Sequence, residues 1–174
     1  MMTDYLRARG GENEEEKYMH NIEAAYKKYS KMIYQVSFSY MKNPADAEDI
    51  IADVFVKLIA AKKEFQSEEH EKAWILRAAI NLCKDRLKHW RRKCVNIDER
   101  ENLQGKTNLF EPNEILKSVM ELPEKYKSVV YLHYYEGYTA EEIAKILKKP
   151  QSSIRVHLHK ARKLLKEVLS ENEK

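Results

Sequence analysis

The side chains that could carry catalysis are few and poorly spaced for it. His157 and His159 suggest a metal pair, but two residues along a helix correspond to about 200° of rotation, so the rings diverge. Metal-binding helices use three- or four-residue spacing. The carboxylates of residues 46–53 suggest a metal-dependent phosphohydrolase, but no cluster on neighbouring helices completes one, and the chain has no glycine-rich phosphate loop. We therefore expect a protein that is not an enzyme and needs neither cofactor nor metal.

Basic side chains offer the clearer chemistry, since they gather in two stretches far apart in the sequence. The first stretch is residues 84–93 and the second is residues 155–166. The net charge is only +4, so the distribution of charge is more informative than its sum. Two separated basic helices indicate two contacts with a polyanion. Solvated, lysine-rich helix faces are the alternative interpretation.

The composition predicts long helices that position these charges. Glycine and proline number only four each, while 43% of residues are hydrophobic and 34% are charged. Such a composition without strand-like alternation favours an all-α fold. No run approaches the roughly 20 apolar residues of a membrane span, and the N-terminal stretch lacks the apolar core of a signal peptide. We expect a soluble, cytoplasmic protein in which Cys83 and Cys94 are ordinary thiols.

Apolar residues at three- and four-residue spacing define a first helical domain, residues 18–93. The expected elements are, in chain order, a disordered lead over residues 1–17, a helix over 18–41, a second helix capped by Asn43, a polar loop over 61–69, and a third helix over 70–92. Asparagine followed by Pro44 is a favourable helix start. The buried faces are expected to include Tyr26 and Ile59.

A break in this pattern predicts a flexible linker over residues 94–111. The stretch is polar and net acidic, and it contains Gly105. A second small helical domain then follows over residues 112–170. We expect the two domains to move independently of each other.

A capped helix, a short turn and a basic helix close the second domain. Thr139 and Glu142 have the spacing of a capping box. They precede a helix over 140–148, and a turn ending at Pro150 leads to a last helix over 152–169. This arrangement is typical of a helix-turn-helix, whose second helix enters the major groove of DNA.

The last helix has an apolar face and a basic face. The side chains expected to face DNA are Ser152, Ser153, Arg155, Val156, His159 and Lys160. A three-helix bundle with a merely solvated basic face is the alternative. It is less favoured, because the helix carries no acidic residue before Glu167.

Several segments together resemble one known family. YTAEEIAKILKKPQSSIRVHLHKARKLLK, with LPEKYKSVVYLHYYEGY ahead of it, resembles region 4 of an extracytoplasmic-function (ECF) sigma factor. YMKNPADAEDIIADVFVKLI resembles the region 2 segment that docks on the polymerase clamp, and KAWILRAAINLCKDRLKHWRRK resembles the helix that recognises and opens the −10 element. The resemblance implies a transcription initiation factor that binds RNA polymerase core. It implies that the second domain recognises the −35 element of promoter DNA and the first domain melts the −10 element.

The resemblance also implies roles for individual residues. Asp49 and Asp53 fall where the family has acidic residues that meet the polymerase. Interaction with the helix dipole is the alternative, but it accounts poorly for Asp53, which lies further into the helix. The side chains implied to contact the −10 element are Phe65, Arg77, Asn81, Lys84, Lys88, Arg91 and Arg92.

Three residues depart from the family pattern. Ala52 stands where a glutamine is usual beside the clamp, Lys148 replaces a turn glycine, and His157 replaces an arginine of the recognition helix. These departures bear on clamp affinity and promoter sequence. An anti-sigma factor is a candidate further partner. The alternative function is a plain helix-turn-helix regulator with an N-terminal sensing or dimerisation domain, which would not need the basic stretch 84–93 and would not co-purify with core polymerase.

Overall fold

The computed structural model describes residues 13–93 and 112–172, and every regular element within these ranges is helical. The elements form a first group of α2 (Glu14–Met41), α3 (Pro44–Ala61) and α4 (Glu68–Lys93), and a second group of α5 (Glu114–Glu121), α6 (Glu124–Val130), the π-helical turn η1 (Tyr131–Tyr135), α7 (Ala140–Leu147) and α8 (Gln151–Asn172). The all-α prediction is confirmed. The predicted linker, residues 94–111, and residues 1–12 of the predicted lead lie outside the described residues.

Helix α2 begins earlier than the apolar pattern predicts. Residues 14–17 are helical rather than part of a disordered lead, because Glu14, Glu15 and Glu16 occupy the first turn. Carboxylates there interact favourably with the positive end of the helix dipole and offset the lack of buried contacts. The first helix thus gains a turn that periodicity alone does not reveal.

Helices α3 and α4 both begin at side chains that cap them. The Asn43 side chain accepts a hydrogen bond from the backbone N–H of Asp46 at 3.2 Å, and Pro44 takes the first helical position as predicted. The Ser67 hydroxyl accepts from the N–H of His70 at 3.2 Å, so α4 begins at Glu68. Each cap satisfies an N–H that the helix itself leaves unpaired.

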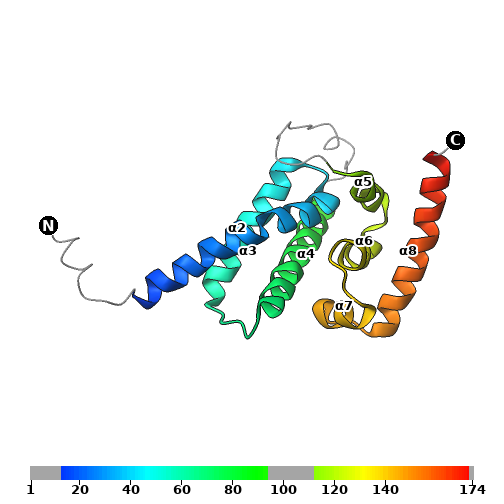
Figure 1. The fold of residues 1–174 in the computed structure, drawn as a ribbon. Coiled ribbons are helices and arrows are strands. Elements are labelled where there is room, and N and C mark those ends of the chain that lie inside the picture. Colours follow the sequence, from blue (N-terminus) through cyan, green and yellow to red (C-terminus); the bar gives the residue numbers. More distant parts are fainter. Residues whose placement is uncertain (1–12, 94–111, 173–174) are drawn as a thin grey trace.

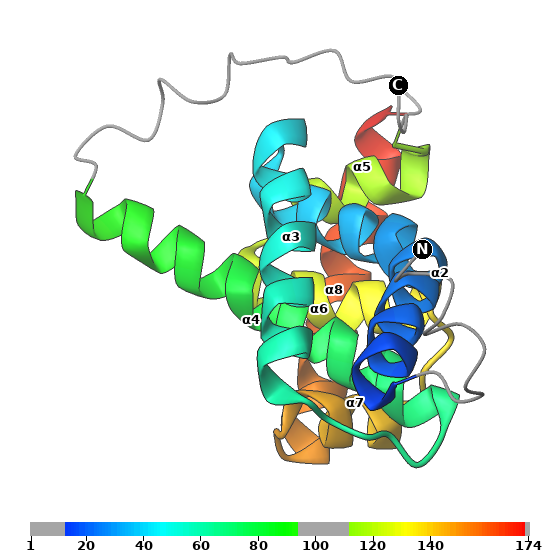
Figure 2. The ribbon, with the colours of Figure 1, turned by 90° about the vertical axis from the view of Figure 1, so that its left-hand side faces the viewer.

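The first group packs around fully buried aliphatic side chains, among them Ile33, Ile50, Ile75 and Ile80. Figure 1 shows α4 lying between the α2–α3 pair and the second group. Figure 2 shows the last turns of α4 extending past α3. The basic C-terminal end of α4 is therefore left largely outside the first group's core.

The second group contains the predicted helix-turn-helix. The Thr139 hydroxyl accepts from the N–H of Glu142 at 3.3 Å, and the Glu142 carboxylate accepts from the N–H of Thr139 at 2.8 Å, which confirms the capping box. Gly137 (φ +74°) ends the preceding turn, and Lys148 (φ +52°) ends α7 in the left-handed region. Helix α8 then follows and forms the far edge of the molecule (Figure 1).

The two groups of helices pack against each other in the described residues, a contact that the sequence does not predict. The Lys127 ammonium of α6 donates a hydrogen bond to the backbone carbonyl of Ser39 in α2 at 2.7 Å, and Lys127 is only 6% exposed. Lys72 of α4 pairs with Glu136 at 2.7 Å. Tyr131 is fully buried and lies within the same core as the first group. Apolar burial of this kind holds groups together even where a linker would let them separate.

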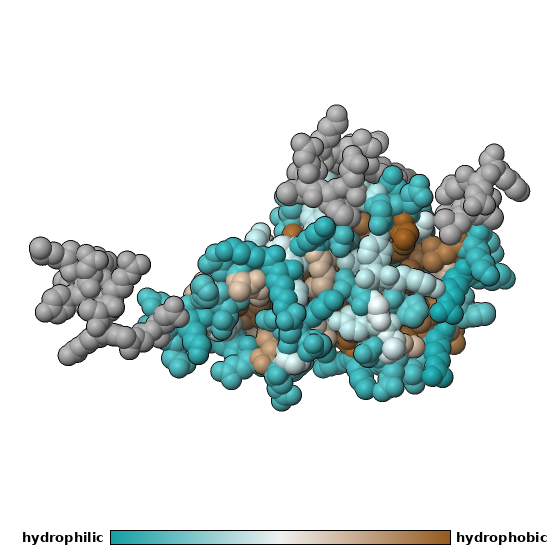
Figure 3. Space-filling view, viewed as in Figure 1, coloured by the Kyte–Doolittle hydropathy of each residue, from teal (hydrophilic) through white to brown (hydrophobic). Residues whose placement is uncertain are grey.

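No helix in residues 13–93 and 112–172 combines the length and the apolar character needed to cross a membrane. Figure 3 shows hydrophilic residues over most of the face seen in Figure 1, with hydrophobic residues visible chiefly beside α8.

Candidate nucleic-acid interface and acidic face

The outer side of α8 carries the predicted DNA-facing residues. Ile154, Leu158 and Ala161 turn inward and are buried. The six predicted side chains lie on the other faces: Ser152, Arg155, Val156, His159 and Lys160 are exposed, and Ser153 is half-buried. A helix with one buried face and such an outer side can enter a major groove without disturbing its own core.

His157 takes no part in this outer surface. Its ring packs edge-on against Tyr126 at 5.5 Å, and its Nδ1 is buried without a hydrogen-bond partner in the described part of the chain. Burial, followed by the positive charge of Lys149, lowers the pKa of His157. His157 and His159 therefore diverge as the sequence predicts, and His157 lies where α8 meets α6.

The predicted −10 residues of α4 fall into two sets. Asn81, Lys88 and Arg92 are exposed, whereas Arg77 and Lys84 are half-buried. Arg91 is the remaining predicted −10 residue on α4, and it pairs with Glu124 of the second group. The structure thus leaves part of the predicted set facing outward and turns part of it toward the second group.

Lys84 lies at the boundary between the two groups. Burial lowers the pKa of its ammonium, and the nearby charge of Lys149 in the turn before α8 lowers it further. Positive charges from α4 and from the helix-turn-helix therefore lie close together. Such a concentration of like charge favours binding of a polyanion.

Phe65 lies in the loop before α4 and is half-buried. Its ring packs edge-on against Trp74 at 5.9 Å and His70 at 5.6 Å, and the Lys63 ammonium lies 5.7 Å from the ring centre. Trp74 is itself half-buried against the core. The loop therefore presents a small aromatic and cationic surface, which is the kind on which bases stack.

The acidic face of α3 carries Asp49 and Asp53. Arg86 of α4 reaches both: its Nη2 is 2.8 Å from Asp53 Oδ2, and its Nη1 is 3.5 Å from Asp49 Oδ2. The sequence places Arg86 in the basic stretch 84–93 but does not predict its contact with α3. One signal in the sequence could have indicated this contact. Arg86 lies on the same side of α4 as Ala79 and Cys83, which are buried.

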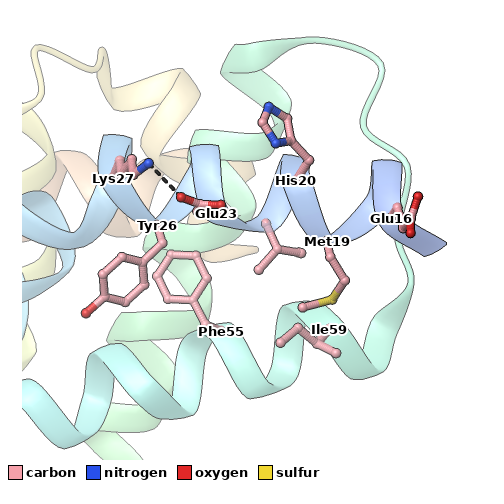
Figure 4. Close-up of a pocket in the computed structure, with 9 residues that line it drawn as sticks. Glu16, Met19, His20, Glu23, Tyr26, Lys27, Phe55 and Ile59 are labelled. Carbon is pink, nitrogen blue, oxygen red and sulfur yellow. Dashed lines mark hydrogen bonds and ion pairs between the residues drawn. The ribbon is translucent and has the colours of Figure 1, made fainter. Parts of the chain in front are cut away.

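An open apolar hollow lies between the first half of α2 and the end of α3 (Figure 4). Met19, Ile22, Tyr26, Phe55 and Ile59 line it. Tyr26 is 50% exposed and Ile59 is 38% exposed, so the prediction that both are core residues is wrong. Both lie on the correct helix face, but no third element covers them in the part of the chain that is described.

The described residues contain no group of three or more histidine, cysteine, aspartate or glutamate side chains that could hold a metal ion.

Comparisons with known proteins match both groups of helices. The model of sigma-70 region 2 matches residues 25–93, and the model of sigma-70 region 4 matches residues 113–165. The chain is 26% identical to the RNA polymerase sigma factor SigV of Bacillus subtilis over 137 residues, covering 76% of this chain and 81% of SigV. It is 25% identical to the ECF RNA polymerase sigma factor SigW of the same organism over 158 residues, covering 81% of this chain and 84% of SigW.

A solved structure also resembles the whole fold. It is the sigma factor RpoE in complex with the anti-sigma factor NepR from Bartonella quintana, with a TM-score of 0.67 and 17% sequence identity. The alignment covers 86% of this chain and 97% of that chain. The likeness therefore extends over both groups of helices.

Proposed function

This chain belongs to the sigma-70 family and is an ECF sigma factor, and we propose that its two groups of helices divide promoter recognition between them. The protein binds RNA polymerase core, directs it to promoters and is not an enzyme. The observation that carries this function is the match of regions 2 and 4, in order, onto the two groups of helices. A plain regulator with a sensing domain does not account for the region 2 match.

In the proposed division, α8 recognises the −35 element. Arg155 and Lys160 are exposed on its outer side, where side chains of this kind bind guanine edges or phosphates. Val156 is 49% exposed although apolar. An exposed apolar side chain on a recognition helix is suited to contact with a thymine methyl group.

The first group is proposed to bind the −10 element and the polymerase. Asn81, Lys88 and Arg92 project from α4, and Phe65 adds an aromatic surface for an unstacked base. Asp49 is 69% exposed on α3 and is suited to a basic docking partner. Helices α3 and α4 pack side by side, so docking of α3 would set the orientation of α4.

The packed arrangement cannot serve both promoter elements at once. Elements centred about 25 base pairs apart are separated by roughly 85 Å at 3.4 Å per base pair. Helix α4 contacts α7 of the helix-turn-helix directly, and Lys84 lies at that boundary. We therefore expect the two groups to separate when the protein acts with core polymerase, and we expect weak promoter binding by the protein alone.

The cytoplasm is the proposed place of action, since core polymerase and promoter DNA are there. An anti-sigma factor is a proposed further partner, and the support is that the related RpoE structure is a complex with one.

A fluorescent base analogue placed in the −10 element tests the proposed function. Each unstacked step costs a few kcal/mol, which a single small domain is not expected to supply. We expect a signal only when core polymerase, this protein and a cognate promoter are all present. A signal from the protein alone would contradict the proposal, as would no signal in the complete mixture on a promoter that the complex binds.

A further inference from the structure

Arg86 occupies an unusual place in the first group of helices. It extends from α4 to α3, and its side chain is only 22% exposed. Its guanidinium reaches the Asp53 carboxylate at 2.8 Å, the Asp49 carboxylate at 3.5 Å and the backbone carbonyl of Asp46 at 3.4 Å. One side chain therefore contacts three successive turns of the helix that carries the proposed docking face.

The contacts distinguish the two carboxylates. The 2.8 Å contact to Asp53 is a charge-assisted hydrogen bond of normal length, and the Asp53 side chain is 46% exposed. The 3.5 Å contact to Asp49 is too long for a strong hydrogen bond, and Asp49 is 69% exposed. Asp53 is thus engaged within the protein, whereas most of the Asp49 carboxylate faces solvent.

We propose that Arg86 is a positioning residue for polymerase docking, and that Asp53 acts through Arg86 while Asp49 meets the polymerase. The inference rests on the proposed docking role of α3 and refines it, since the resemblance alone places both carboxylates at the polymerase. The Arg86–Asp53 pair holds α3 against α4. The orientation of the −10 helix is then fixed relative to the docking face.

Helix geometry shows why Arg86 can do this without touching DNA. Residues on a helix are rotated by about 100° each. Arg86 and Lys88 therefore point in nearly opposite directions, so Arg86 faces α3 while Lys88 faces solvent. The rival interpretation is that the pair is an ordinary half-exposed ion pair with little effect on stability or docking.

A charge swap separates these interpretations. The full-length protein carries Asp53→Arg, Arg86→Asp, or both changes, and its affinity for core polymerase is measured at several salt concentrations. We expect each single change to weaken core binding at least tenfold, because it places two like charges in contact. The double variant restores the pair with its charges reversed, and we expect its affinity to return to within threefold of the original.

Two matched variants control for charge alone. Lys88→Asp makes the same charge change on the opposite side of α4, and we expect it not to restore binding when combined with Asp53→Arg. Asp49→Arg is expected to weaken core binding and to remain weak when combined with Arg86→Asp. The salt dependence of core binding gives a second measurement, which a merely structural role would leave unchanged. This salt dependence should become weaker for Asp49→Asn and stay unchanged in the charge-swapped double variant.

The outcomes are distinguishable. Circular dichroism and thermal unfolding establish which variants fold, and Arg86→Lys, which keeps the charge, should retain most of the affinity. A folded double variant that binds core as weakly as Asp53→Arg would show that Asp53 meets the polymerase directly and would overturn the inference. Unchanged binding by folded Arg86→Asp would overturn it as well. Unchanged binding by Asp49→Arg would instead refute the proposed docking face itself.

Discussion

Lys127 offers the sharpest test of how the two groups of helices hold together. Its ammonium is buried at their interface, donates to the Ser39 carbonyl at 2.7 Å and lies 5.9 Å from the centre of the Tyr40 ring. Ser39 lies in the last turn of α2, where the helix leaves carbonyls without an N–H partner. The Lys127 side chain, which belongs to the second group, therefore caps the C-terminal end of α2.

The interface should depend on pH through this lysine. Burial, followed by the charge of Lys42, lowers the pKa of Lys127 from 10.5 to about 8, although Glu121 and Glu124 oppose the change. When the groups separate, the lysine is solvated and its pKa returns toward 10.5. Between these values the separated form binds a proton that the packed form has released, so rising pH favours the packed form.

The magnitude follows from the same values. A pKa change from 10.5 to about 8 is equivalent to roughly 3 kcal/mol between charged and neutral lysine. As the pH rises from about 8 to 10.5, we expect the free energy that favours the packed form to increase by up to about 3 kcal/mol. Below about pH 8, Lys127 should contribute no pH dependence to packing. Lys127→Met should remove most of the pH dependence. It should also strengthen packing at neutral pH by about 1 kcal/mol, because the loss of a buried charge outweighs an unpaired Ser39 carbonyl.

Single-molecule energy transfer can count the packed and separated forms directly. Dyes on cysteines introduced at the exposed Lys57 of α3 and Lys163 of α8, with Cys94 changed to serine, report the distance between the groups. Lys125→Met is the matched control, since Lys125 is exposed beside Lys127 and should leave the pH dependence intact. A packed fraction that falls with rising pH would refute this reasoning. The same pH response in Lys127→Met as in the unchanged protein would also refute it.

Three further changes test the helix-turn-helix. Arg155→Ala should cost about 1–3 kcal/mol and relax specificity at one −35 position, measured over a promoter library; a uniform loss, as expected for Lys163→Ala, would show a phosphate contact instead. Lys148→Gly should raise the unfolding free energy by about 1 kcal/mol, because Lys148 has φ +52°, and a lower melting temperature would contradict this. Thr139→Ala should lower stability by about 0.5–2 kcal/mol through loss of the capping box; Thr139→Ser is the control, and equal loss in both would count against the cap.

Local signals in the sequence were reliable where both partners lie within one helical turn. Thr139 and Glu142 are three residues apart, as are Asn43 and Asp46, and both caps form as predicted. Such contacts depend on backbone geometry that the residues themselves specify. Helix existence and the outer face of α8 were predictable for the same reason.

Contacts across the fold were not predictable in this way. Arg86 and Asp53 are 33 residues apart, and Lys127 and Ser39 are 88 apart. Their pairing depends on how helices pack, which periodicity does not encode. Periodicity likewise gives the apolar side of a helix without showing whether another element covers it, and Tyr26 and Ile59 line an open hollow for that reason. The polar linker likewise gives no sign that α2 contacts α5 and α6 of the second group.

We propose that helix α4 connects docking, packing and DNA binding, because a different face of it is available for each. Arg86 faces α3, Arg91 and Lys72 pair with the second group, and Lys88 faces solvent. Separation of the groups would break the pairs of Arg91 and Lys72 but would leave Arg86 on Asp53. Lys84 would then lose its cover at the boundary and Arg91 its partner Glu124, so we expect more of the predicted −10 residues to be available in the separated form. Docking through α3 would hold these residues at a fixed angle, since α3 and α4 remain joined by Arg86.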